Sequence, residues 1–169
     1  LCVGHAKGLY LLILNPDTIV YPDVLKRLIN FTDGHKKVGI VAPNLLKPDK
    51  TPYEFVGTGA LSPLSAVFSL TFLNKVFPNN PISKHYWLKS EKKVKEVEVC
   101  PGTAFLIKKS LFDKLDGFDE HFFLYFEESD LCLRVRKLGY KIYILKDSKV
   151  IHLWARSTPD VKRREKWFR

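Results

Sequence analysis

Two short apolar runs constrain the fold more than any other feature of this sequence. Residues 9–14 and 38–42 contain no charged side chain, and Asn or Pro follows each run directly. Short apolar runs without alternation are typical of strands buried on both faces of a parallel sheet. Between them, Pro22 and Asp23 predict a helix start, because Pro suits the first helical position and Asp suits the positive end of the helix dipole. Strand, helix and strand in this order predict a βαβ unit and an α/β fold.

The predicted first helix ends near Gly34. Its apolar stripe comprises Val24, Leu25, Leu28 and Ile29. In the second half of the chain, the same patterns predict strands at 94–99, 102–107, 140–145 and 149–152, and helices at 109–115 and 127–138.

The middle of the chain has a different pattern. Prolines interrupt every period between residues 48 and 92, where only residues 68–77 suit a short helix. A long irregular stretch of this kind is often a lid or a substrate-shaping loop, and it is equally typical of a variable, mobile insertion. The basic tail, residues 160–169, predicts a helix. The length of 169 residues predicts a single domain.

Composition excludes several classes of protein. With 46% apolar residues the chain is not disordered, and no apolar run approaches the roughly 18 residues of a membrane span. Three cysteines without a CxxC pair fit a reduced cytosolic compartment better than a disulfide framework or a zinc site. Because no secretory leader pattern is present, we expect a cytoplasmic protein.

The chain begins with Leu and contains no Met, so we expect it to be a piece of a longer product.

The first candidate site follows the first strand. Ligands in α/β folds gather beyond the carboxyl ends of strands, where Asn15-Pro16-Asp17 stands. An Asp in such a turn can hold a divalent cation that neutralises a diphosphate. The alternative, favoured by the local sequence alone, is that Asp17 simply forms the turn.

The second candidate site is the acidic segment Glu127-Glu128-Ser129-Asp130, which follows an aromatic run. Glu127 and Asp130 share a helical face, and Glu128 points about 100° away. A carboxylate beside aromatic rings can be desolvated and act as a general base. The alternative is that these acids complement the helix dipole.

His152, just after a predicted strand, is the third candidate. A single His is more often a packed residue than a ligand, so its role depends on its neighbours. The basic cluster at residues 162–169 is either a solvated face or a surface that attracts phosphates or an anionic membrane.

Three segments, taken together, resemble a known family. They are "LLILNPDT", "CPGTAFLIKKSLFDKLDGFDEHFFLYFEESDLCLRVRKLGYKIYIL" and "VIHLWARST". In this order they resemble the family 2 inverting glycosyltransferases, especially the rhamnosyltransferase-like branch. The resemblance implies a GT-A fold, a Rossmann-related mixed sheet flanked by helices. It also implies a nucleotide-diphosphate sugar donor and a divalent metal, Mg²⁺ or Mn²⁺. Because the nucleotide-binding strands of that family precede its D-x-D element, the chain is expected to match the C-terminal two-thirds of the catalytic domain.

The resemblance assigns roles to individual residues. Asn15-Pro16-Asp17 matches the variant D-x-D element, so Asp17 is the implied metal and diphosphate ligand, and His152 completes the metal site. Glu128 stands where the family has its catalytic base. The usual base is Asp, so the carboxylate of Glu128 is one methylene farther from the backbone.

Other residues are implied in donor or acceptor binding. Gly102 and Thr103 match the small-residue strand that lines the acceptor side, and Ser157 follows His152 at the usual spacing. Ala155 departs from the Gly that the branch commonly carries. The remaining implied binding residues are Asn15, Glu127 and Asp130.

The implied function is inverting, metal-dependent transfer of a sugar, with rhamnose as the family-level expectation. The acceptor would be a growing cell-surface polysaccharide or another glycan, or a polyprenyl-linked molecule at an anionic membrane. One alternative is a catalytically inactive remnant that serves as a structural or interaction module. The other is a nucleic-acid-binding module, suggested by the net charge of +10. Since no nucleic-acid-binding motif is present, no nucleic-acid partner is expected.

Overall fold

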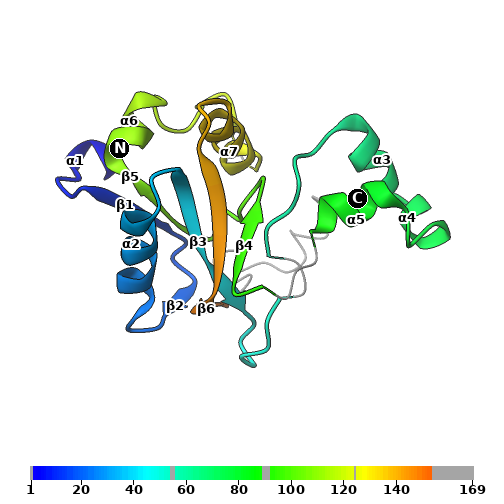
Figure 1. Ribbon diagram of the computed structural model, residues 1–169, viewed down its shortest axis with the longest axis horizontal. Helices are drawn as coiled ribbons and strands as arrows, with labels where there is room; N and C mark the ends of the chain where they lie inside the picture. Colours follow the sequence, from blue (N-terminus) through cyan, green and yellow to red (C-terminus); the bar gives the residue numbers. More distant parts are fainter. Residues whose placement is uncertain (1, 54–55, 89–91, 124, 154–169) are drawn as a thin grey trace.

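The computed structural model describes residues 2–53, 56–88, 92–123 and 125–153, and within them six strands form one sheet (Figure 1). The strand order is β1-β5-β3-β6-β2, and β4 also pairs with β6. Among the described strands, β3 and β6 alone pair in parallel and the other pairings are antiparallel, so the predicted mixed sheet is confirmed. The strands are β1 (Tyr10–Leu14), β2 (Thr18–Val20), β3 (Val38–Leu46), β4 (Val94–Val97), β5 (Ala104–Lys108) and β6 (Lys141–His152).

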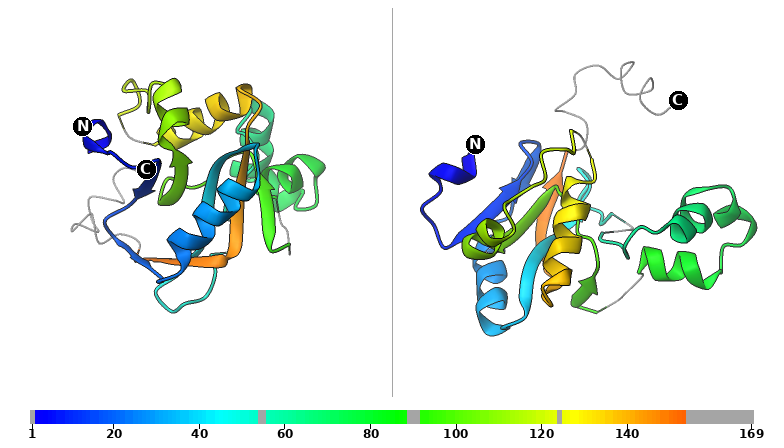
Figure 2. Two further views of the ribbon diagram at one scale, coloured as in Figure 1. Left: turned by 60° about the vertical axis from the view of Figure 1, so that its left-hand side comes forward. Right: turned by 90° about the horizontal axis from the view of Figure 1, so that it is seen from above.

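The core surrounds β3, whose first six residues are all buried, as expected for a strand covered on both faces. Helices α2 (Val24–Gly34), α6 (Lys109–Lys114) and α7 (Glu127–Lys137) flank the sheet (Figure 2). From α2, the Phe31 ring packs edge-on against Tyr143 of β6, with ring centroids 5.3 Å apart. Gly39 lets α7 approach closely, because a methyl group built there would lie 2.4 Å from Cγ1 of Val135.

The first strand differs from the prediction. β1 lies at one end of the strand order and is only half-buried, so its predicted burial on both faces is wrong. The reason is topological, since β5 comes from later in the chain and pairs with both β1 and β3. Because β5 is antiparallel to each, β1 and β3 run parallel to one another. The βαβ connection is therefore present, with β5 inserted between its strands.

The two strands predicted near the end of the chain are one continuous strand, β6. Its partner β3 likewise runs through the predicted stop at Pro43-Asn44. Pairing jumps from Pro43↔Leu145 to Asn44↔Lys149, so the predicted break is only an irregularity in the sheet. The two halves of β6 have different antiparallel neighbours, β4 on the first and β2 on the second.

Helix α2 begins within two residues of the predicted start. Asp23, the residue that precedes the helix, pairs with Arg27 one turn later. Val24 and Leu28 are buried as predicted, but Leu25 is exposed, so the apolar stripe is narrower than expected.

The middle of the chain forms three short helices, α3 (Pro63–Leu70), α4 (Leu73–Val76) and α5 (Pro81–Trp87), set to one side of the sheet (Figure 1). The predicted single helix over residues 68–77 is wrong, because the extended backbone of Thr71 ends α3. A further short helix, α1 (Cys2–His5), lies near the start of the described residues. The predicted helix at 160–169 lies outside the described residues. No helix in the described part of the chain has the length and hydropathy needed to cross a membrane.

Candidate functional site

The turn after β1 is held by hydrogen bonds from both sides. The Asn15 amide donates to the carbonyl of Thr103 at 2.9 Å, which joins the end of β1 to the start of β5. The Thr18 hydroxyl donates to the Asn15 carbonyl at 2.8 Å and closes the turn. Asp17 lies in this turn and is buried. The turn therefore directs the Asp17 carboxylate into the protein.

The Asp17 carboxylate meets His152, the last residue of β6. Thr18 pairs with His152 in the β2–β6 ladder, and the Leu153 amide donates to the Asp17 carbonyl at 2.9 Å. These contacts place Nε2 of His152 3.3 Å from Oδ1 of Asp17, with both side chains buried. Two residues separated by more than 130 positions in the sequence therefore form one polar pair.

Tyr53, which the sequence analysis missed, borders this pair. Its hydroxyl donates to the His152 carbonyl at 3.4 Å, and its ring centroid lies 6.4 Å from that of His152. Burial raises the pKa of Tyr53, and the negative charge of Asp17 raises it further. Its proline-flanked position in an irregular stretch gives no periodic signal that could have singled it out.

The second cluster lies at the start of α7. Tyr125 and Phe126 both have left-handed backbone conformations, with φ of 65° and 69°, so the chain turns sharply before the helix begins. Glu128 follows in the first helical turn and is half-buried. Burial is the main cause of its raised pKa, and the charge of neighbouring Glu127 adds to it. A carboxylate with a raised pKa is a stronger proton acceptor than an ordinary Glu.

The other two acids of this segment are in different environments. The Asp130 carboxylate binds Nε of Arg134 at 2.7 Å, and Arg134 also donates to the Leu115 carbonyl. Asp130 is thus part of the anchor between α7 and the end of α6. One carboxylate oxygen of Glu127 is buried without a hydrogen-bond partner among the described residues.

The loop before β5 connects the two clusters. Thr103 contacts the first cluster through Asn15, whereas Gly102 lies against the side chain of Glu128, and a methyl group built at Gly102 would be 3.5 Å from Cβ and Cγ of Glu128. The structure therefore joins Asn15, Thr103, Gly102 and Glu128 in one continuous series of contacts. Ser157, the remaining predicted binding residue, lies outside the described residues.

Asp17 and His152 are chemically suitable for part of a metal site. Carboxylate oxygen and imidazole nitrogen are both ligands of Mn²⁺, and carboxylate oxygen is the preferred ligand of Mg²⁺. Their facing atoms are buried and lie close together. Over the described ranges, His, Cys, Asp and Glu side chains form no group of three able to hold a metal. A cation bound by this pair would depend on further ligands such as diphosphate oxygens or water.

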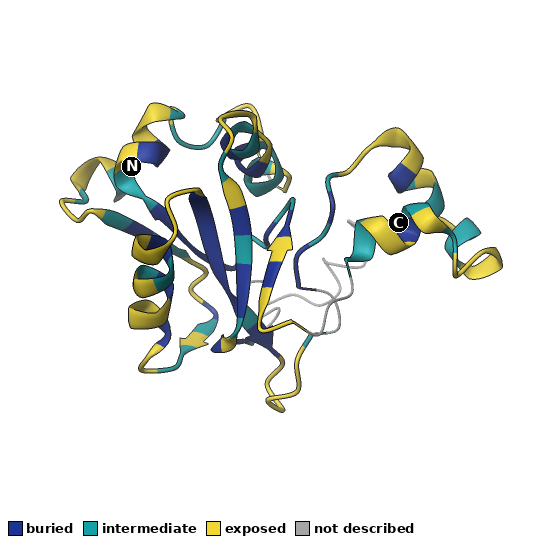
Figure 3. Ribbon diagram, viewed as in Figure 1, coloured by how far each residue is buried: buried dark blue, intermediate teal, exposed yellow. Residues whose placement is uncertain are grey.

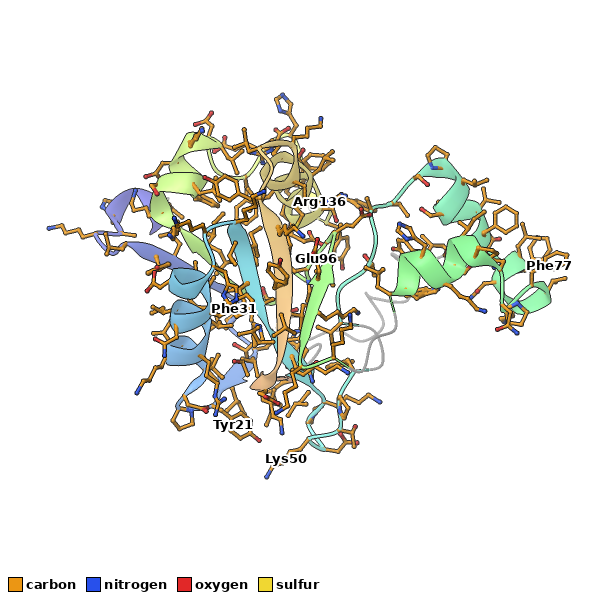
Figure 4. The ribbon with its side chains drawn as sticks, viewed as in Figure 1. Tyr21, Phe31, Lys50, Phe77, Glu96 and Arg136 are labelled. Carbon is orange, nitrogen blue, oxygen red and sulfur yellow. The ribbon has the colours of Figure 1, made fainter. Side chains whose placement is uncertain are left out.

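A separate hollow lies at the other end of α7. It is lined by β4, β6 and the helix end, where Glu96 and Arg136 are exposed to it (Figure 4). The guanidinium of Arg136 pairs with Glu98, and Lys141 pairs with Glu96 at 2.9 Å. The charged side chains that line this hollow in the described part of the chain are therefore paired with one another.

The chain is similar in sequence to two rhamnosyltransferases and in structure to a solved protein. No family model matches it. It is 26% identical over 150 residues to an N-acetylglucosaminyl-diphospho-decaprenol L-rhamnosyltransferase of Mycobacterium tuberculosis, covering 88% of this chain and 48% of the relative. It is 27% identical over 146 residues to the rhamnosyltransferase WbbL of Escherichia coli K12, covering 85% of this chain and 52% of the relative. A crystal structure of GalNAc-T7 with UDP, GalNAc and Mn²⁺ matches 90% of this chain and 29% of its own, with 14% identity and a TM-score of 0.60.

The fold is that of a GT-A glycosyltransferase. The predicted fold class and the predicted resemblance to rhamnosyltransferases are both confirmed. A hexosyltransferase of Haloferax volcanii, named for low-salt glycan biosynthesis, is a further relative at 24% identity over 131 residues, 78% of this chain and 38% of its own. The chain spans about half the length of the rhamnosyltransferases it matches. The described site therefore belongs to a GT-A fold.

Proposed function

We propose that the protein containing this chain is an inverting glycosyltransferase that uses a nucleotide-diphosphate sugar. The observation that carries the proposal is the series of contacts from the buried Asp17–His152 pair to Glu128. The pair offers ligands for a charged diphosphate complex, and the half-buried Glu128 offers a base. Similarity to rhamnosyltransferases over most of the chain supports this combination.

Glu128 is the proposed general base. It would remove the proton of an acceptor hydroxyl, whose oxygen attacks the anomeric carbon while the bond to the diphosphate breaks on the opposite face. A single displacement of this kind inverts the anomeric configuration. The raised pKa of Glu128 supports the role, because a base works best when its pKa approaches the operating pH.

Asp17 and His152 are the proposed ligands of Mg²⁺ or Mn²⁺. A divalent cation neutralises charge on the departing diphosphate. The protein places these two ligands before the donor binds, because the β2–β6 ladder and the Leu153–Asp17 hydrogen bond hold the two residues next to each other. Asn15, Gly102, Thr103, Glu127, Asp130 and Ser157 are the proposed donor- or acceptor-binding residues.

The donor sugar and acceptor are proposed from the relatives. Two of them are named rhamnosyltransferases, and one name includes a diphospho-decaprenol acceptor. We infer a rhamnose donor and a glycan or polyprenyl-linked acceptor for this protein. An inactive remnant with the same fold is the second candidate, because two residues of the described part alone do not complete a metal site.

Donor binding by thermal shift tests the proposal on the longest gene product that contains the chain. Wild type and Asp17→Asn are compared with dTDP- and UDP-sugars, each with and without Mg²⁺ or Mn²⁺. A ligand present at 100 times its Kd stabilises the native state by about 2.7 kcal/mol, so modest affinity is measurable. A metal-dependent shift that Asp17→Asn removes supports the enzyme. No shift with any donor favours the remnant.

A further inference from the structure

The three helices α3, α4 and α5 have a polar interior and an apolar exterior. Their only buried residues are serines, namely Ser65 and Ser69 of α3 and Ser83 of α5. Apolar side chains of the same segment are exposed by 44% to 71%: Leu61, Leu64, Val67, Leu70, Phe72, Val76 and Phe77. Figure 3 shows this helical unit as mostly exposed beside a buried sheet. Ordinary globular helices have the opposite arrangement.

Hydroxyl groups hold the helical unit together. Ser69 donates to Ser83 at 3.3 Å, and Ser83 donates to the Phe68 carbonyl at 2.8 Å, which ties α5 to α3. Ser62 and Ser65 form a reciprocal cap at the start of α3. Small residues permit close helix packing, so Ser69 and Ser83 let α3 and α5 approach one another while most Leu, Val and Phe side chains of the unit stay exposed or only half-buried.

The exposed apolar residues of α3 form one face. At about 100° per residue, Leu64, Val67 and Leu70 span an arc of about 120°, centred opposite Ser65 and Ser69. Phe72, Val76 and Phe77 continue the apolar surface along α4, and Phe77 lies at the end of the unit farthest from the sheet (Figure 4). Seven large apolar side chains exposed on one small helical unit are unusual for a protein surface and indicate an interaction site.

The charge of the helical unit indicates what covers this surface. Between Val56 and Leu88 the sequence contains no Asp or Glu, and its charged residues are Lys75 and Lys84, both exposed. Apolar side chains with cations and no anions match the interface of an anionic bilayer. A second copy of the chain is a poorer match, because each copy has a net charge of +10 and presents the same cationic unit.

We propose that the α3–α5 unit docks on the surface of an anionic phospholipid membrane, with the apolar side chains of residues 61–77 inserted among the lipids. The residues of this surface differ from those of the basic tail at 162–169, and docking does not depend on sugar transfer. Segment 56–60 connects the unit to the sheet, where the Ala60 amide donates to Glu98 at 2.6 Å.

Vesicle co-sedimentation of the full gene product tests the proposal. Vesicles contain either phosphatidylcholine alone or a 7:3 mixture with phosphatidylglycerol. The patch variant is Phe72→Ser/Phe77→Ser, and the matched control is Leu9→Ser/Leu138→Ser, which removes two exposed apolar side chains elsewhere. We expect binding to the anionic vesicles to fall by at least about tenfold in the patch variant and to stay unchanged in the control. Hydrogen exchange in peptides covering 61–77 should slow on binding.

Three results would overturn the proposal. One is wild-type binding by the patch variant at an unchanged Tm. Another is complete loss of binding when Lys162, Arg163 and Arg164 are replaced by Gln with the patch intact, because binding would then depend on the tail. The third is a concentration-dependent dimer in sedimentation velocity that the patch variant abolishes, since the surface would then join two copies.

Discussion

Gly102 lies against Glu128, with room for one methyl group between them: a Cβ built at Gly102 would be 3.5 Å from Cβ and Cγ of Glu128. The contact joins the loop before β5 to the first turn of α7. The same loop accepts a hydrogen bond from Asn15 through Thr103, so the position of the proposed base is coupled to the turn that carries Asp17.

Glu128→Gln should abolish most sugar transfer while leaving donor binding near the wild-type level. The amide keeps the shape of the side chain but cannot accept the acceptor proton, and general-base assistance contributes about 10²–10⁴-fold. Initial rates of transfer and donor affinity by calorimetry check this. Glu120→Gln, an exposed acid in the preceding loop, is the control. Equal loss of transfer and donor affinity in Glu128→Gln would contradict the base role.

The pH dependence of the free energy of unfolding should report the half-buried carboxylate of Glu128. Its folded-state pKa is raised, so the folded protein binds the proton more tightly than the unfolded chain. Its contribution is favourable at acidic pH and is lost as the pH rises through the raised pKa. At pH 7, Glu128→Gln should therefore unfold at the same Tm as wild type or at a higher one. A lower Tm at pH 7 would mean that the ionised carboxylate stabilises the fold.

Gly102 should tolerate a small side chain but not a large one. In Gly102→Ala the added methyl group makes an ordinary van der Waals contact with Glu128. The Tm should therefore stay within a few degrees of wild type, and the rate of transfer within a few-fold. Gly102→Leu would displace the Glu128 side chain, and transfer should fall by at least about tenfold, as misplacement of a catalytic group does. Full transfer by a folded Gly102→Leu protein would show that the contact with Gly102 does not position Glu128 for catalysis.

Gly39→Ala should destabilise the core. The added methyl group would lie 2.4 Å from Cγ1 of Val135 and 2.8 Å from Cβ of Tyr140, so α7 would have to move away from β3. Overpacking of this kind costs about 1–3 kcal/mol. Gly34→Ala is the matched control, because nothing lies within 4 Å of its added methyl group. Denaturant unfolding should give a lower free energy of unfolding for Gly39→Ala than for Gly34→Ala. Equal free energies would show that α7 moves away from β3 at no cost.

Lys95 should make stability rise with pH in alkaline solution. Its buried ammonium donates to the carbonyls of Val56 and Gly57, and burial lowers its pKa to about 8. Between that pH and its ordinary pKa of 10.5, the unfolded chain binds more protons than the folded one, so folding becomes more favourable as pH rises. Across this pH window, the free energy of unfolding of wild type should rise relative to that of Lys95→Met by up to about 3 kcal/mol. If the difference in free energy of unfolding between the two proteins stayed constant with pH, the pKa of Lys95 in the folded protein would be the ordinary one.

The sequence by itself determined the α/β class, the positions of α2, α6 and α7, and the residue types of the site. Local rules suffice for these features, because apolar periodicity and helix-start residues act over a few positions. The acids Asp17 and Glu128 were identified from their places after a strand and at a helix start, together with the family resemblance.

Only the tertiary structure decided which of these residues meet. The 3.3 Å approach of His152 to Asp17 depends on β2–β6 pairing, and the half-buried state of β1 depends on insertion of β5 beside it. Strand order and register arise from contacts between distant segments, which no local pattern encodes. The same holds for α3 and α5, where Ser69 and Ser83 meet because the two helices pack on each other.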